Sequence, residues 1–178
     1  MNTLIRLLAV LTILTISSGC AITNSYGPYM GKVVDTETEE PIEGAVVFLR
    51  FFNDCFGQVS SFADAVEVLT DANGEFRIPS HRIFTLRPLC GWHTDCYPIV
   101  FKPGYGAFSR HAGTSISEWG EEGCLPRKKP VTIKLPKLTT REERKENLYN
   151  IPNIDAPSHK FKKLSELEQE ERKVVFGK

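Results

Sequence analysis

Four of the five cysteines, together with one histidine, are the residues whose types and spacing could support chemistry in this chain of 178 residues. Cys90, His93 and Cys96 are each three positions apart, and Cys55 or Cys124 could complete a set of four ligands. Zinc accepts Cys and His in such tetrahedral sites, so a Cys/His metal-binding protein is one interpretation. An even number of cysteines without a Cys-x-x-Cys pair favours disulfides instead. We expect a local Cys90–Cys96 bridge across a loop, a second bridge Cys55–Cys124, and no metal.

The remaining acid and base side chains form no catalytic motif. His81 and His111 stand apart from any Gly-x-Ser-x-Gly elbow, His-Glu-x-x-His pair or P-loop, none of which occurs in the chain. No Cys-x-x-Cys-His haem attachment is present either. The sequence therefore predicts no enzyme, no catalytic residues and no cofactor.

The fifth cysteine, Cys20, ends a segment with the composition of an export signal. Arg6 supplies a positive charge, residues 7–16 are mostly apolar, and small residues fill positions 17–19. This order is typical of a secretory signal peptide, and ten apolar residues are too few for a spanning helix. We expect residues 1–19 to be a signal peptide and residues 20–29 to be a tether.

The stretch Ile16-Ser17-Ser18-Gly19-Cys20 resembles the lipobox of bacterial lipoproteins. That resemblance implies that Cys20 is lipidated, that cleavage occurs before it, and that acyl chains anchor the protein in a membrane. Ala21 follows, and the absence of Asp at that position favours the outer membrane over the inner one. The expected location is therefore the bacterial envelope, on the outer membrane facing the periplasm.

The overall composition excludes several classes of protein. Hydrophobic residues make up 41% and charged residues 25%, close to the average of soluble globular proteins. Lys and Arg total 22, and so do Asp and Glu, so the formal net charge is zero. A neutral chain gives no general reason to expect a nucleic-acid partner.

Short β-strands must position the cysteines. Branched and aromatic residues alternate or cluster in short segments separated by turn residues, which predicts an all-β sandwich. An Asn73-Gly74 pair predicts a hairpin turn, and before residue 139 a helix is possible at residues 61–66 only. The predicted strands are residues 31–35, 45–52, 66–70, 75–78, 98–102 and 131–135.

Four motifs in this strand region resemble those of the carboxypeptidase regulatory-like domain. They are Gly-x-Val-x-Asp at residues 31–35, Pro-Ile-x-Gly-Ala-x-Val at 41–47, Thr-Asp-x-x-Gly-x-Phe at 70–76 and Gly-Tyr at 104–105. The resemblance covers residues 30–138 and implies a transthyretin-like seven-stranded β-sandwich with loop insertions at 53–65 and 81–97. In metallocarboxypeptidases this domain accompanies a separate catalytic domain, and no residues of this chain match that part.

Residues 139–178 form a charged C-terminal tail in which 17 of 40 residues are charged. Thr140 is the expected cap of a first helix, and Ser165 with Glu168 the expected capping box of a second. Few apolar residues lie between them, and they are scattered. We expect surface helices or disorder that pack little on the sandwich, with a docking arm as the alternative.

These features predict a non-catalytic, lipid-anchored envelope protein with a binding or scaffolding sandwich. Its partners would be the membrane, through Cys20, and an envelope protein or a glycan. The alternative function is an accessory subunit of an envelope secretion or export complex.

Overall fold

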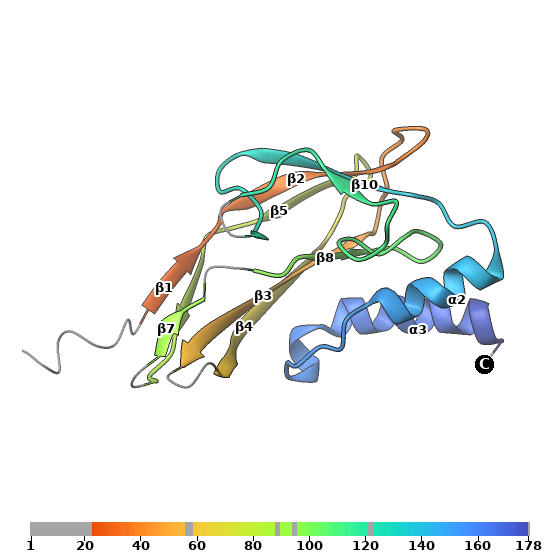
Figure 1. The fold of residues 1–178 in the computed structure, drawn as a ribbon. Helices are drawn as coiled ribbons and strands as arrows, with labels where there is room; N and C mark the ends of the chain where they lie inside the picture. Colours follow the sequence, from red (N-terminus) through yellow and green to blue (C-terminus); the bar gives the residue numbers. More distant parts are fainter. Residues whose placement is uncertain (1–22, 56–58, 88–89, 94–95, 121–122, 178) are drawn as a thin grey trace, which may run out of the picture.

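The computed structural model describes residues 23–177, except for residues 56–58, 88–89, 94–95 and 121–122. Over these residues the protein is mostly β-sheet with two helices at the C-terminus, and its sheets are open (Figure 1). The elements are β1 (Thr23–Tyr26), β2 (Tyr29–Asp35), β3 (Val46–Cys55), β4 (Val59–Leu69), β5 (Glu75–Ile78), β6 (His81–Phe84), β7 (Cys90–Trp92), β8 (Ile99–Phe101), β9 (Ser115–Ile116), β10 (Pro130–Leu135), α2 (Arg141–Asn150), the 3-10 turn η2 (Ser158–Lys160) and α3 (Lys162–Phe176).

Two main sheets share one core. The first has the strand order β5-β2-β10-β9, with β10 parallel to β2, and the second is built on the long β3–β4 hairpin. Strands β8 and β7 pair with the beginning and the end of β3, respectively. A separate two-stranded ribbon, β1–β6, extends from these sheets toward the N-terminus (Figure 1).

All six strands expected from the sequence are present, and the turn at Gly74 is confirmed. Gly74 has a φ of 72°, and the Asp71 carboxylate accepts hydrogen bonds from the backbone N–H groups of Asn73 and Glu75. The expected hairpin is wrong, however, because β4 pairs with β3 whereas β5 pairs with β2. The turn therefore carries the chain from one sheet to the other. Residues 61–66 are strand rather than helix.

Strand β3 is buried on both faces. Val47, Leu49 and Phe51 face the core between the sheets, while Val46 and Phe48 belong to a second cluster on the opposite side. The second cluster contains Leu164 of α3, which is fully buried, and partly buried apolar residues of the connection between the helices. The C-terminal helices thus cover the outer face of the β3–β4 sheet (Figure 1).

The expectation of a poorly packed tail is therefore wrong. Polar contacts hold both helices to the segment that follows β8, because the Asn147 amide joins the backbone N–H of Ala107 and the carbonyl of Tyr105 at 2.8 and 2.9 Å. Glu171, fully buried, accepts from the Gly104 N–H at 3.1 Å and forms a two-pronged ion pair with Arg144 at 2.5 and 2.8 Å.

The two helices are capped by residues from different parts of the chain. Thr140 caps α2 as expected, in a reciprocal capping box with Glu143. The expected Ser165 cap is wrong, because α3 already begins at Lys162. Its first N–H groups, of Lys163 and Leu164, donate instead to the carboxylate of Glu67 in β4, at 2.8 and 3.1 Å. A strand of the sheet therefore caps the helix that lies on it.

Candidate functional site

The four cysteines expected to form disulfides do so, with a different pairing. The bridges are Cys55–Cys90 and Cys96–Cys124, so the expected Cys90–Cys96 and Cys55–Cys124 pairs are wrong. The reason lies in strand pairing, because β7 places Cys90 directly opposite Cys55 on β3. Cys96 lies in the core with no exposed surface, where Cys124 meets it. Cys20, the expected lipidation site, lies outside the described residues.

This arrangement does not bring the residues of the metal-binding alternative together. Cys90 and Cys96 belong to different disulfides, and the described part of the chain contains no group of three or more His, Cys, Asp or Glu residues that could hold a metal ion. His93 lies 2.6 Å from an Asp54 carboxylate oxygen through Nδ1 and 2.8 Å from the Tyr97 hydroxyl through Nε2. The hydrogen bond from His93 lowers the pKa of Asp54.

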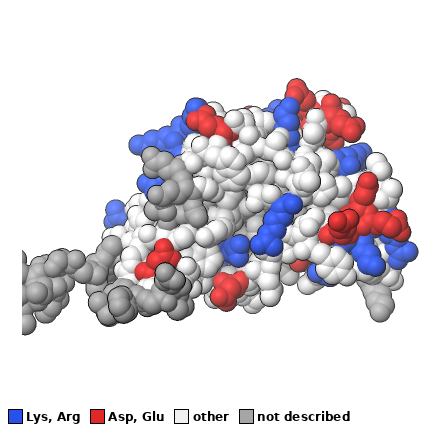
Figure 2. Space-filling model, viewed as in Figure 1, with Lys and Arg blue, Asp and Glu red and all other residues white. Residues whose placement is uncertain are grey.

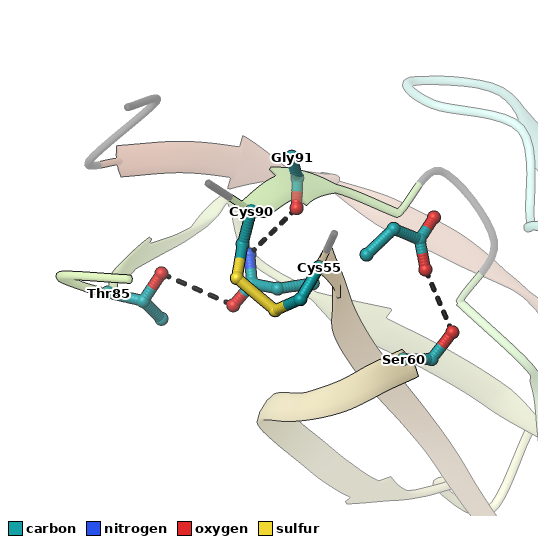
Figure 3. The surroundings of a disulfide bond; sticks show 7 residues. Cys55, Ser60, Thr85, Cys90 and Gly91 are labelled. Carbon is teal, nitrogen blue, oxygen red and sulfur yellow. Dashed lines mark hydrogen bonds between the residues drawn. A yellow bond between two sulfur atoms is a disulfide. The ribbon is translucent and has the colours of Figure 1, made fainter. Parts of the chain in front are cut away.

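Hydrogen bonds around the Cys55–Cys90 bridge tie three segments together (Figure 3). Asn53 of β3 donates from its amide to the carbonyl of Gly91 in β7 at 3.2 Å and accepts from the Thr85 hydroxyl at 3.2 Å. Thr85 follows β6, so this end of β3 is joined covalently to β7 and by a hydrogen bond to the β1–β6 ribbon. The disulfide and these hydrogen bonds hold the end of β3, β7 and the end of β6 together near the start of the described chain.

Apolar side chains are exposed at the end of β6, next to this disulfide. In β6 and the residues after it, Ile83 is buried and Thr85 bonds to Asn53, whereas Phe84 and Leu86 are 68% and 71% exposed. This follows from the alternation of side chains along an extended chain. Phe84 pairs in register with Thr23, the first described residue, so both exposed side chains lie where the chain enters the fold.

A cleft of about 590 Å³ opens between the N-terminal strands and the segment after β9. Tyr26 and Tyr29 form part of its wall, and Glu118 and Arg127 contribute charges of opposite sign. Trp119 is 46% exposed and stacks on Phe108 with ring centroids 5.5 Å apart. Apolar walls with polar groups among them are typical of small-ligand sites, so this cleft is a candidate for ligand binding.

An acid–base cluster joins β4 to β6 and to η2. The Asp64 carboxylate in β4 accepts from His81 at 2.8 Å and from the Lys160 ammonium at 2.6 Å. Burial alone would raise the pKa of Asp64, but the hydrogen bonds from Lys160 and His81 outweigh it, and the pKa is lowered. Because Lys160 belongs to η2, this cluster fastens the helical segment to the sheet.

Sequence reasoning overlooked the exposed side chains of Phe84, Leu86 and Trp119. Period-two alternation after position 81 was the available signal for Phe84 and Leu86. No described helix is long and apolar enough to cross a membrane. Searches for similar proteins find no matching family model, no similar curated protein and no similar solved structure.

Proposed function

We propose that the protein is a non-catalytic, lipid-anchored protein of the bacterial envelope whose β1–β6 end lies on the membrane surface. Lipid on Cys20 would hold it on the outer membrane, facing the periplasm, and the sheets would act as a binding or scaffolding module. The observation that carries this proposal is the exposure of Phe84 and Leu86 beside the point where the chain enters the fold.

The distance along the chain is short enough for both contacts to form together. Two residues, Ala21 and Ile22, lie between Cys20 and Thr23, so the three steps of the chain span at most about 11 Å. An acyl chain on Cys20 would therefore bring Phe84 to the headgroup region, where apolar side chains insert by about 5–10 Å. Arg82, exposed on the same face of β6, can meet lipid phosphates there.

The disulfides support export. All four cysteines of the described chain are paired, and such bonds persist in oxidising compartments such as the bacterial periplasm. Burial of Cys96 at the centre of the core makes that bridge part of the folded structure rather than an exposed redox pair.

For the fold, we propose a transthyretin-like sandwich of the carboxypeptidase regulatory-like kind. Its first motif lies in β2, where Gly31 admits a close neighbour: a Cβ there would be 2.3 Å from the Val131 carbonyl oxygen and 2.9 Å from the Phe76 ring. Phe76 itself ends the third motif and is buried. Residues of the first and third motifs are thus neighbours, because Gly31 of β2 and Phe76 of β5 are partners in register.

The cleft lined by Trp119 is the proposed place for an envelope protein or a glycan partner. An exposed indole offers a flat apolar surface with a polar edge, and Glu118 and Arg127 add hydrogen-bonding groups at the same cleft. Sugars present both kinds of surface.

Lipid labelling tests the anchor. We expect wild-type protein to incorporate labelled fatty acid and to fractionate with the outer membrane, and Cys20→Ala to do neither, because no other residue can take the lipid. Labelled Cys20→Ala protein would refute the lipoprotein assignment.

A photoreactive phospholipid tests the orientation. The peptide that contains Phe84 and Leu86 should be crosslinked in vesicles of phosphatidylethanolamine and phosphatidylglycerol. The peptide that contains Tyr149 of α2, equally exposed at 73%, serves as the internal control. Equal labelling of both peptides would contradict the proposed orientation.

A further inference from the structure

A charged side chain continues the apolar outer face of β3. Val46 and Phe48 on this face are covered by the C-terminal helices. Arg50 follows at the next position of the alternation, at the edge of the surface that these helices and their connection cover. Arg50 is half-buried, and the chain that connects α2 and α3 passes beside it through Asn153. Arg side chains are mostly exposed in folded proteins unless they are paired, so a half-buried Arg on this face is unusual.

The Arg50 guanidinium has few partners. Its Nε atom is buried and has no hydrogen-bond partner, and its Nη1 atom lies 3.5 Å from the carbonyl oxygen of Asn153. The rings of Phe52 and Tyr97 lie 5.8 and 5.9 Å from its central carbon. These rings hold the guanidinium plane in place without satisfying its donors.

A second guanidinium shares the same small cavity. The backbone of Phe108 pairs with Val100 of β8, and the turn that follows brings Ser109 and Arg110 to the outer surface beside Arg50. The cavity has a volume of about 70 Å³ and is lined by Arg50, Tyr97, Pro98, Ile99, Ser109, Arg110 and Pro152. In Figure 2, Lys and Arg side chains gather near the middle of the face shown.

The two charges are not neutralised by the described chain. None of the ion pairs among the described residues includes Arg50 or Arg110. Burial, and next the charge of Arg110, lower the pKa of Arg50, whereas Tyr97 and Asp155 act weakly in the opposite sense. Two like charges that face each other in a half-buried cavity repel, and an anion between them would remove that repulsion.

We propose that this cavity, named here the arginine pocket, binds an oxyanion group, either a carboxylate or a phosphate, at the end of a larger ligand. Guanidinium groups present planar pairs of donors that match both groups. The Arg50 and Arg110 guanidinium groups and the Ser109 hydroxyl belong to residues that line the pocket, and they are the donors we assign to it. The volume equals that of about two water molecules, so one anionic group fits and the remainder of the ligand stays outside.

Calorimetric titration of the detergent-solubilised full-length protein tests this inference, with inorganic phosphate and acetate as probes at constant ionic strength. We expect one anion to bind per chain, and the tighter of the two probes identifies the ligand chemistry. Arg50→Gln and Arg110→Gln should each weaken binding about tenfold or more. Arg50→Lys should also weaken it, because an ammonium lacks the planar donor pair.

Arg77→Gln is the matched control, since it removes the same charge from an exposed position of β5, in the other sheet, and should leave binding unchanged. If Arg50→Gln fails to fold, Arg110→Gln decides, because Arg110 is exposed and its loss leaves no cavity. Absence of saturable binding of either probe at millimolar concentration would overturn the proposal. An equal loss of binding in Arg77→Gln would also overturn it, since it would show only a response to net charge.

Discussion

Replacing Leu164 with Ala measures how far the C-terminal helices stabilise the sheets. Leu164 has no exposed surface and packs in the cluster that contains Val46 and Phe48. Truncation of a buried Leu costs about 2–5 kcal/mol, more where the surroundings cannot close over the void. Here the backbone at Leu164 is held to β4 by Glu67, so collapse is restricted. We expect a loss of about 3–5 kcal/mol.

Urea unfolding of the oxidised protein is the assay, because both disulfides remain intact and the slope should stay unchanged while the midpoint falls. In a heating experiment the same loss lowers the melting temperature by roughly 6–20 °C, at about 2–4 °C per kcal/mol. Val174→Ala on the same helix is the control, since Val174 is 58% exposed and should change stability by less than about 0.5 kcal/mol. Equal effects of the two substitutions would refute the packing of α3 on the sheet.

Two further substitutions test the polar contacts. Arg144→Ala should destabilise the protein by about 3–5 kcal/mol in urea unfolding, because it leaves the buried Glu171 carboxylate unpaired; a change as small as that of a surface substitution would contradict this burial. Asp64, whose pKa is lowered in the folded protein by Lys160 and His81 against the effect of burial, contributes stability above its unfolded pKa of about 3.9 that is lost as the pH falls further. The free energy of unfolding should therefore decrease more steeply below about pH 4 in wild type than in Asp64→Asn, and parallel curves would exclude a stabilising role for the carboxylate.

The strands could be predicted from the sequence because their signals are local. The alternation of Val131, Ile133 and Leu135 matches their burial in β10, and Gly74 adopts the positive φ that its turn requires. The strand at residues 45–52 was also predicted, and its run of apolar residues at 45–49 is typical of a strand covered on both faces. The sequence did not show what covers it.

The remaining features depend on contacts between distant segments. The contact face of α3 contains few apolar residues. Its cap is Glu67 of β4, and no local pattern near Lys162 indicates a cap from a distant strand. The disulfide pairing was missed because it follows from the register of β3 with β7, not from proximity in sequence. No local pattern indicated the arginine pocket, because Arg50 and Arg110 line the same cavity only in the folded chain.

The disulfide connectivity has a consequence for how the chain can be oxidised. Cys55 pairs with Cys90, and Cys96 with Cys124, so the two covalent loops follow one another along the sequence without overlap. A chain that enters an oxidising compartment N-terminus first presents its thiols in the order in which they pair. With the Cys20 sulfur occupied by lipid, as proposed, an oxidant that joins each new thiol to the previous unpaired one produces both native bonds, and the slow reshuffling of mispaired bridges is not required.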